Sequence, residues 1–390
     1  MSKKKGYIDT NVYETSLDRI RDIYDKFDKV VVSFSGGKDS TVVLNLCLEI
    51  AKEKNKLPLE VIFFDEEAIH PPTIEYCKRV SERKDINFKW YCLEVKHRNA
   101  CSNEEPFWYT WDKEKKDLWV RPLPDTAITE HPRFRKGDSF QDFAPYIYSR
   151  KDGTVAMLTG IRTEESLRRL RVILNKKNQH YINTNSENKS SVFRAFPIYD
   201  WSSQDVWIAV KKLGWDYNTT YDIFNQTRLH NKFLTQRVCP PFGEEPLRGL
   251  WIYSECFPEM WHKMLNRVKG VATAWRYANT ELYAAPKEKP IGITWEQYLK
   301  IILDSYEHDS KQDVIKTINK YIRYHQERSK KSIPESEENP LSGVSWKFLC
   351  RIAIRGDFKG RQQSVITKAQ LAARERLKHL TEDEIKKQYG

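Results

Sequence analysis

The stretch Val31–Ser40, VVSFSGGKDS, decides the fold of this chain. A β-branched apolar run is followed by two adjacent glycines, Gly36 and Gly37, and then by an apolar-periodic segment from Lys38 to Ile50. This pattern predicts a buried strand, a tight turn and an amphipathic helix. The residues around the two glycines therefore predict one strand–loop–helix unit of an α/β domain.

The chemistry of the loop suits a phosphate. Adjacent glycines let backbone N–H groups gather around an anion, and the helix that follows directs its unpaired N–H groups and positive dipole end at the same place. The spacing is not that of a Walker A loop. The alternative is a glycine-rich turn that is merely capped by Asp39 or Ser40. The candidate nucleotide-binding residues here are Ser33, Ser35, Gly36, Gly37, Lys38, Asp39 and Ser40.

Length and composition favour a globular protein. The chain has 390 residues, 39% hydrophobic and 31% charged, and a typical domain has about 100–200 residues. No apolar run approaches the ~18 residues that a membrane span requires. The start, MSKKKGYIDT, lacks the apolar stretch of a secretory signal. We therefore expect a cytoplasmic protein of two domains, or two with a small third element, and no membrane partner.

The cysteines predict neither a metal site nor a disulfide framework. All seven are scattered, without a CxxC pair or zinc-like spacing. An odd number in such a chain predicts reduced thiols, several of them buried, with Cys47 in the core. An iron–sulfur cluster would need four thiolates in a recognisable pattern, so we expect none.

Positive charge is concentrated in the last third of the chain. The formal net charge is +12, and residues 261–390 alone carry nine of these excess charges. This asymmetry predicts a polyanionic partner such as nucleic acid, with a solvated basic face as the alternative. In the basic stretch 346–378, Trp346 and Phe348 are interleaved with the cations, whereas Leu349 and Ile352 favour docking of the segment on the main body.

Strand and helix patterns alternate through the first part of the chain. The expected strands are 57–67, 88–95 and 155–162, and the expected helices are 7–28, 72–83 and one that begins at an N-cap, Ser202 or Ser203. This order implies βαβ crossovers and a doubly wound parallel sheet. The alternation lapses over 96–150, where we expect an elaborated loop whose tryptophans are core anchors.

We expect three regions. A nucleotide-binding domain covers 1–230, a mainly helical domain covers 231–331, and a basic C-terminal segment covers 340–390. The polar, acidic stretch 332–339 between the last two is expected to be a linker.

Two further patterns add candidate site residues. Gly160 ends an expected strand, where a missing side chain lets a ligand approach, and Arg162 follows with the bidentate geometry that phosphate oxygens favour. Glu164 and Glu165 can orient the arginines or help to bind Mg²⁺; the alternative is a helix start with i,i+4 pairs such as Glu164 with Arg168.

The second of these patterns is the end of the strand beside the loop. Asp65 closes the apolar run VIFFD, where it can reach a nucleotide hydroxyl, a metal or a substrate. The alternative is an exposed acid at a strand end.

Together these stretches resemble the phosphoadenosine-phosphosulfate (PAPS) reductase branch of the PP-loop ATPases. The matches are SGGKDS (35–40), FFDEEAIHPPTIEY (63–76), GIRTEESLRR (160–169) and PIYDWSSQDVW (197–207). The resemblance implies a Rossmann-like fold of the adenine nucleotide alpha hydrolase kind, binding of ATP with Mg²⁺, and cleavage between the α and β phosphates.

The resemblance also implies residue roles. Ser35–Ser40 would hold the phosphates, the chain at Phe64 and Asp65 would meet the adenosine, and Gly160 and Arg162 would complete the nucleotide site. The implied catalytic residues are Lys38, Asp39, Arg162 and Arg168, and the implied Mg²⁺ ligands are Asp39 and Glu165.

The remainder of the chain is similar to IbrA-like sulfurtransferase or reductase proteins of bacteria and prophages, which occur beside a ParB-like partner. The matching stretches are QRVCPPFGEEPLRGLW (236–251), TWEQYLKIILD (294–304) and SWKFLCRIAI (345–354). The chain departs from PAPS reductases because it ends LTEDEIKKQYG, without the catalytic cysteine motif. Cys239, beside Arg237, is the best remaining thiol, with a packed cysteine at a proline turn as the alternative.

These observations predict an ATP pyrophosphatase that activates an acceptor or drives sulfur transfer. One alternative is a nucleotide-dependent regulatory module that binds nucleic acid or a ParB-like protein without turnover. PAPS reduction is the other alternative, and the absent thiol motif weighs against it.

Overall fold

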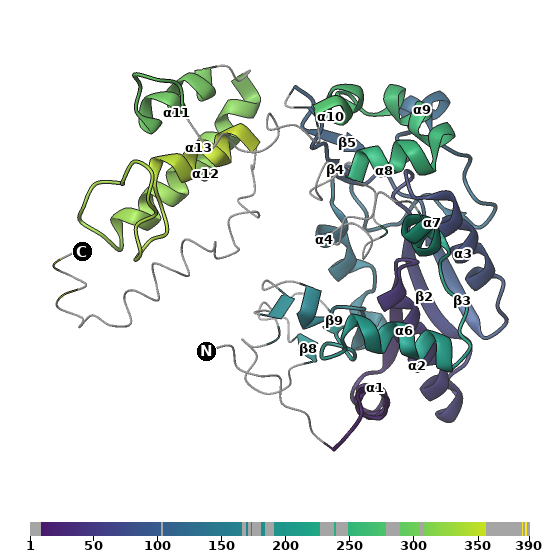
Figure 1. The fold of residues 1–390 in the computed structure, drawn as a ribbon. Coiled ribbons are helices and arrows are strands. Elements are labelled where there is room, and N and C mark those ends of the chain that lie inside the picture. The colour runs from purple at the N-terminus through teal and green to yellow at the C-terminus, as the bar shows by residue number, and fades with distance from the viewer. Residues whose placement is uncertain are drawn as a thin grey trace. The chain divides into compact units, whose positions relative to one another are not determined.

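A computed structural model gives the fold. It describes residues 9–102, 104–165, 169–170, 173, 181–183, 191–226, 238, 249–277, 289–304 and 308–355, with residues 384 and 387. The chain forms two compact units (Figure 1). Unit 1 comprises Met1–Arg98 and Phe107–Val268, and unit 2 comprises Asn99–Pro106 and Lys269–Gly390. Each is described here by itself.

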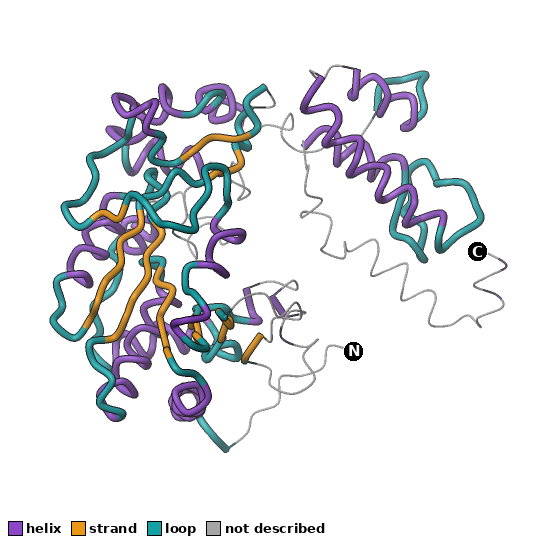
Figure 2. Tube along the Cα trace, turned by 180° about the vertical axis from the view of Figure 1, so that it is seen from behind, coloured by secondary structure: helices purple, strands orange, loops and turns teal. Residues whose placement is uncertain are grey.

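Unit 1 is built on a mostly parallel sheet, whose strands lie side by side in Figure 2. The strand order is β6-β3-β2-β1-β7-β9-β8, and every pairing is parallel except that of β8 with β9. The bounds are β1 Lys29–Phe34, β2 Leu59–Phe64, β3 Ile86–Tyr91, β6 Ala127–Ile128, β7 Val155–Leu158, β8 Ile182–Asn183 and β9 Val192–Ala195. The expected parallel sheet is confirmed.

Buried side chains lie on both faces of this sheet. Along β1, Val30 and Val32 belong to one apolar cluster and Val31 to another, as the two-residue period of a strand requires. The first cluster lies under helices α1, α2, α3 and α6, and the second includes Phe143 of α4. The helices of unit 1 are α1 Val12–Lys26, α2 Lys38–Glu53, α3 Pro71–Ser81, α4 Phe140–Phe143, α6 Ser203–Lys212, α7 Thr220–Gln226, α8 Gly249–Cys256 and α9 Pro258–Arg267.

The segment between β3 and β7 is the elaborated loop expected from the sequence. It contains the hairpin of β4 Lys96–Arg98 and β5 Phe107–Tyr109, and the 3₁₀ segments Lys113–Leu118, Ala144–Tyr146 and Arg150–Asp152. Trp108 and Trp111 are buried, so the expectation that these tryptophans serve as core anchors is confirmed for them.

Helices α8 and α9 pack in unit 1 although they follow residue 230, the boundary that we expected between domains. Arg267 of α9 forms a buried ion pair with Glu67, and Tyr253 of α8 donates a hydrogen bond to the carbonyl oxygen of Ala68. Both helices are therefore fixed on the loop between β2 and α3. The expected domain boundary at residue 230 stays a prediction.

The regular secondary structure described in unit 2 is helical, and loops and turns connect the helices. Its helices are α10 Val271–Tyr277, α11 Trp295–Asp304, α12 His308–Gln326 and α13 Trp346–Arg355. Leu349 and Ile352 of α13 are fully buried against α11 and α12, so residues 346–355 dock by their apolar side chains. The expected linker 332–339 also packs here, because Glu335 accepts a hydrogen bond from the Trp295 backbone and Pro334 from that of Trp346.

Among the residues that the structure describes, no helix combines the length and apolarity that a bilayer crossing demands.

Candidate nucleotide site

The expected phosphate loop joins β1 to α2 by Ser35, Gly36 and Gly37. Gly36 has a φ of +70°, and a Cβ atom there would lie 2.8 Å from Thr73 Cγ2; both facts require glycine. A Cβ on Gly37 would meet nothing closer than 3.4 Å. Gly36 is therefore fixed by packing, whereas a Cβ atom on Gly37 would make only ordinary van der Waals contacts.

Hydroxyl groups close the loop on itself. Ser40 Oγ lies 3.0 Å from Ser35 Oγ, accepts a hydrogen bond from the Ser35 backbone N–H and donates to the Gly37 carbonyl oxygen. Ser35 and Ser40 thus shape the loop; their contact with phosphate stays a prediction. Ser33 lies two residues earlier on β1 and is partly exposed.

Helix α2 begins at Lys38 with no hydrogen bond from an N-cap side chain. The first N–H groups of a helix have no partner within it, so this end offers donors and a positive dipole end to an anion. The Lys38 side chain is only 3% exposed, and its Nζ lies 3.1 Å from Asp39 Oδ2. The sequence-predicted Lys38 and Asp39 therefore form an ion pair at the helix start.

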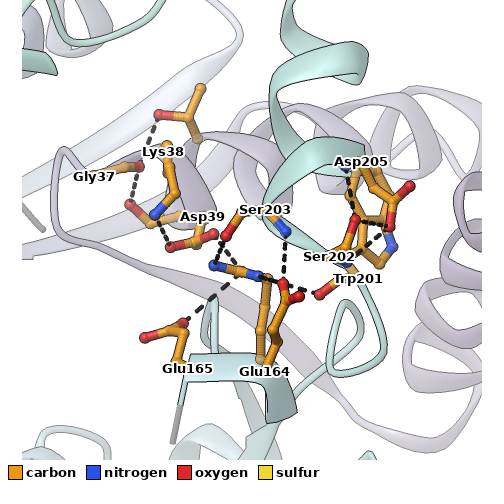
Figure 3. Close-up of polar contacts among 12 residues, drawn as sticks. Gly37, Lys38, Asp39, Glu164, Glu165, Trp201, Ser202, Ser203 and Asp205 are labelled. Atoms are coloured by element: carbon orange, nitrogen blue, oxygen red, sulfur yellow. Dashed lines mark hydrogen bonds and ion pairs between the residues drawn. The ribbon is translucent and has the colours of Figure 1, made fainter. Parts of the chain in front are cut away.

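Figure 3 shows Asp39 near Glu164 and Ser203, and the Arg162 side chain contacts all three of these residues. The Arg162 side chain is 1% exposed, and its Nε donates to Asp39 Oδ1 at 2.6 Å. Its two terminal nitrogens donate to Glu164, to Ser203 Oγ and to the Trp201 carbonyl oxygen. All three nitrogens are engaged within the protein, so in this structure Arg162 holds Asp39 in place. Contact of Arg162 with phosphate stays a prediction.

The PIYDWSSQDVW stretch (197–207) holds this arginine. Ser202 and Asp205 form the capping box that starts α6, so the expected N-cap is confirmed and is Ser202. Asp200 pairs with Arg19 of α1, and Trp201 Nε1 donates to Ser16 Oγ. These contacts place the Trp201 carbonyl oxygen and Ser203 beside Arg162.

Gly160 is needed for packing. A Cβ atom there would lie 2.7 Å from the carbonyl carbon of Asp39 and 2.8 Å from the Ser40 nitrogen. The glycine therefore lets β7 and the start of α2 approach, a different reason from the ligand approach that we expected. Glu165 pairs with Arg169, an i,i+4 pair of the kind that the alternative expected, whereas the pair of Glu164 with Arg168 is not tested. Arg168 and Cys239 lie outside the described residues.

Asp65 ends β2 in a fully buried position. Its carboxylate accepts hydrogen bonds from Trp90 Nε1 at 2.6 Å, from the Glu67 backbone and from Arg121. The expected alternative of an exposed acid is wrong, because these donors bury the carboxylate. Phe64 packs against Phe140 with ring centroids 4.9 Å apart. A role for the chain at Phe64 and Asp65 in binding adenosine stays a prediction.

Three residues next to these positions are additions that the sequence did not indicate. Glu66 is partly exposed, and desolvation together with the Asp65 carboxylate raises its pKa to about 7. Asn218 donates to the Gly36 carbonyl oxygen at 2.9 Å, and the Tyr221 hydroxyl accepts from the Lys38 backbone N–H at 3.0 Å. The last two lie more than 180 residues from the loop, and no local pattern could have paired them with it.

The donor set suits Mg²⁺ shared with a phosphate. Proteins hold Mg²⁺ by one or two carboxylates together with substrate oxygens. Asp39 supplies one carboxylate; Glu165 Oε1 lies 3.9 Å from Arg162 Nε and has no hydrogen-bond partner among the described residues. Within that same part of the chain, no three His, Cys, Asp or Glu side chains are grouped to hold a metal by themselves.

Curated relatives cover most of the chain. It is 29% identical over 378 residues to the Escherichia coli protein named "Uncharacterized protein YbdN", covering 92% of this chain and 91% of that one. It is 27% identical over 274 residues to the Methanocaldococcus jannaschii protein named "Uncharacterized protein MJ0066", covering 69% of this chain and 47% of that one. The chain thus spans about half the length of the second relative.

Solved structures resemble the chain more remotely. The FMN adenylyltransferase of Candida glabrata has a TM-score of 0.34 at 14% identity, covering 57% of this chain and 65% of that one, which is less than two thirds of its length. The PAPS reductase of Candida auris has a TM-score of 0.30 at 15% identity, covering 56% of this chain and 94% of that one.

Two family descriptions divide the chain between them. Residues 231–357 match a domain of unknown function, DUF3440, which includes helices α8 and α9 of unit 1. Residues 29–224 match the phosphoadenosine phosphosulfate reductase domain and contain the phosphate loop, Asp65, Arg162 and Tyr221. The chain therefore belongs to the phosphoadenosine phosphosulfate reductase domain family, with the PP-loop, Rossmann-like fold of adenine nucleotide alpha hydrolases.

Proposed function

We propose that the protein binds ATP with its phosphates on Ser35–Ser40 and cleaves the bond between the α and β phosphates. The observation that carries this proposal is the start of α2, where N–H donors and Lys38 meet beside Gly37, whose missing side chain leaves the backbone accessible to within ordinary van der Waals contact. An acceptor oxygen attacks the α-phosphorus, the bond to the β-phosphate bridging oxygen breaks, and pyrophosphate leaves with that electron pair. The products are an adenylylated acceptor, or AMP when water attacks, and pyrophosphate.

The residues divide this work. Lys38 and the N–H groups of α2 stabilise negative charge on the phosphates, as preorganised donors do. Arg162 acts by fixing Asp39, to which it donates at 2.6 Å. Bound Mg²⁺, held by Asp39 with phosphate oxygens, would neutralise the charge that develops on the leaving pyrophosphate. The acceptor and any sulfur source stay open in this proposal.

The product distinguishes this reaction from ordinary ATP hydrolysis. ATP labelled with ³²P at the α position, incubated with the protein and Mg²⁺, should give AMP and no ADP. The variant Lys38→Met removes the buried ammonium group and should slow turnover by about 100-fold or more, the effect of losing one transition-state charge contact. Lys78→Met, the same change on the exposed side of α3, should leave the rate unchanged. ADP as the product would refute the reaction.

Binding can be tested apart from turnover. The variant Gly37→Val adds a side chain where the phosphates would approach the loop. A Cβ atom there meets nothing closer than 3.4 Å, so we expect the protein to stay folded and calorimetry to show no ATP binding. Unchanged affinity in the folded variant would place the nucleotide elsewhere.

A substitution of Arg162 can show whether this residue positions Asp39 or contacts the phosphates directly. The variant Arg162→Lys keeps the charge but loses the planar fork that reaches Asp39, Glu164 and Ser203 together. We expect a fall in kcat with ATP affinity nearly unchanged, because Asp39 loses its orientation. A rise in KM with unchanged kcat would instead indicate direct contact with the substrate.

A second candidate function is nucleotide binding without turnover, in which occupancy regulates contact with another molecule. The engagement of every Arg162 nitrogen within the protein favours it. Tight ATP binding without pyrophosphate release would support this module over the enzyme. The IbrA-like group, the ParB-like and nucleic-acid partners and the cytoplasmic location stay predictions.

PAPS reduction remains the alternative that the family name suggests. It needs a reactive thiolate, yet five of the six described cysteines are buried, and burial raises the pKa of Cys47, Cys101 and Cys350 to about 12. Release of sulfite from PAPS with dithiothreitol as the reductant, lost in Cys239→Ser, would establish the reductase and refute the pyrophosphatase as the main activity.

A further inference from the structure

Tyr221 lies against the phosphate loop at Gly37 and Lys38. Its hydroxyl oxygen accepts the Lys38 backbone N–H at 3.0 Å. The same oxygen would lie 3.4 Å from a Cβ atom on Gly37, and Val238 Cγ2 would lie 3.8 Å away. A tyrosine hydroxyl and a methyl group thus lie over the glycine that a phosphate would approach.

The segment before Tyr221 is tied to the loop from the other side. Asn218 is fully buried and donates to both the Gly36 carbonyl oxygen and Thr73 Oγ1, at 2.9 and 2.8 Å. Its own side-chain oxygen accepts from the Thr220 backbone N–H. These bonds set the start of α7, and with it Tyr221, beside the loop. The Tyr221 ring packs edge-on against Trp207 at 5.1 Å.

One N–H group makes one linear hydrogen bond. A phosphate oxygen bound to the Lys38 N–H would need the direction and the distance, near 2.9 Å, that the Tyr221 hydroxyl now uses. The hydroxyl and the phosphate therefore compete for this donor. The exchange favours the phosphate, because a hydrogen bond to a charged acceptor is roughly twice as strong as a neutral one.

We propose that the Tyr221 hydroxyl occupies a phosphate position in the nucleotide-free protein and withdraws when nucleotide binds. This inference rests on the proposed ATP site and makes Tyr221 a residue that sets its affinity. Removing the hydroxyl takes away the hydrogen bond that a phosphate must displace, so the variant Tyr221→Phe should bind phosphate more tightly. The expected gain is about fivefold, which corresponds to a neutral hydrogen bond of about 1 kcal/mol.

The test is calorimetry with inorganic pyrophosphate and with ATP. A matched control is Tyr217→Phe: Tyr217 also packs edge-on against Trp207, but its hydroxyl donates to Asp222 and not to the loop. We expect Tyr221→Phe to tighten both ligands about fivefold and Tyr217→Phe to change neither. Thermal unfolding without ligand checks that both variants are folded.

Each outcome decides one question. Weaker or unchanged binding in Tyr221→Phe, when the wild type binds both ligands, would overturn the competition, since the hydroxyl would then contribute to binding or be irrelevant. An equal gain in Tyr217→Phe would overturn it as well, because loosening around Trp207 would explain both. Failure of the wild type to bind either ligand would instead refute the proposed ATP site, and the inference with it.

Discussion

The buried ion pair of Arg267 with Glu67 tests whether α9 is part of the nucleotide-binding unit. The two side chains are 1% and 0% exposed, and Arg267 Nε and Nη2 donate to the two Glu67 oxygens at 2.8 and 2.9 Å. Arg267→Met keeps most of the apolar length but leaves the carboxylate, among the residues that the structure describes, with two backbone donors, Trp111 and Val120. Removing one partner of a buried pair costs about 3–5 kcal/mol, so we expect the free energy of unfolding to fall by that amount.

Urea unfolding followed by tryptophan fluorescence measures the loss. The matched control is Arg79→Met, which breaks a two-bond pair with Asp216 whose side chains are 45% and 56% exposed; such pairs contribute about 0–1 kcal/mol. The double variant Glu67→Gln with Arg267→Met should recover part of the loss, since no buried charge remains unpaired. A loss below about 1 kcal/mol in Arg267→Met, or one equal to that of the control, would refute the anchoring of α9.

Three further results are expected. Gly36→Ala should lower the melting temperature, because of the φ of +70° at this position and the 2.8 Å contact that a Cβ atom would make with Thr73. Gly37→Ala should keep the wild-type melting temperature but lose ATP affinity. Equal melting temperatures of the two variants would contradict this. Burial lowers the pKa of His70 to about 3. Below about pH 6.5, the unfolded chain therefore binds a proton at His70 that the folded protein does not bind. Unfolding free energy should therefore fall by up to about 1.4 kcal/mol per pH unit from 6.5 down to 3, and His70→Phe should flatten that slope in urea titrations. Leu349→Ala, fully buried in α13, should cost about 2–5 kcal/mol, whereas a basic segment that is merely solvated would show no loss.

The sheet could be predicted because its signals are local. Val30, Val31 and Val32 form an apolar run long enough for one buried strand, and the periodicity from Lys38 to Ile50 specifies one helix. Both depend on neighbours within a few residues. The placement of α8 and α9 depends instead on the contact of Arg267 with Glu67, which lies 200 residues earlier in the chain. A local sequence pattern cannot predict a contact between residues so far apart.

The candidate site likewise contains some residues that a local motif predicts and others whose contacts depend on the tertiary fold. The residues of the loop itself, Ser35 to Ser40, were predicted together because one motif holds them. The packing of Gly160 against the start of α2 was not predicted, since a glycine at a strand end looks the same in sequence whether a ligand or a helix lies against it; ligand approach at Gly160 stays a prediction. The contacts of Tyr221 and Asn218 depend on how α7 crosses the loop, which is a property of the tertiary fold.

Ion pairs connect the charged side chains around the phosphate loop. Among the described residues, Lys38, Arg162 and Arg169 face Asp39, Glu164 and Glu165 in a connected set of ion pairs. Three cations balance three carboxylates, so these side chains present almost no net charge to an incoming polyphosphate. Long-range attraction therefore comes mainly from the N–H groups and dipole of α2 and from Mg²⁺ that accompanies the nucleotide, whereas Lys38 acts at short range on phosphates that are already bound. ATP affinity should accordingly depend strongly on Mg²⁺ and only weakly on salt, and a steep loss of affinity between 50 and 200 mM salt, of the kind that a basic patch gives, would contradict this account.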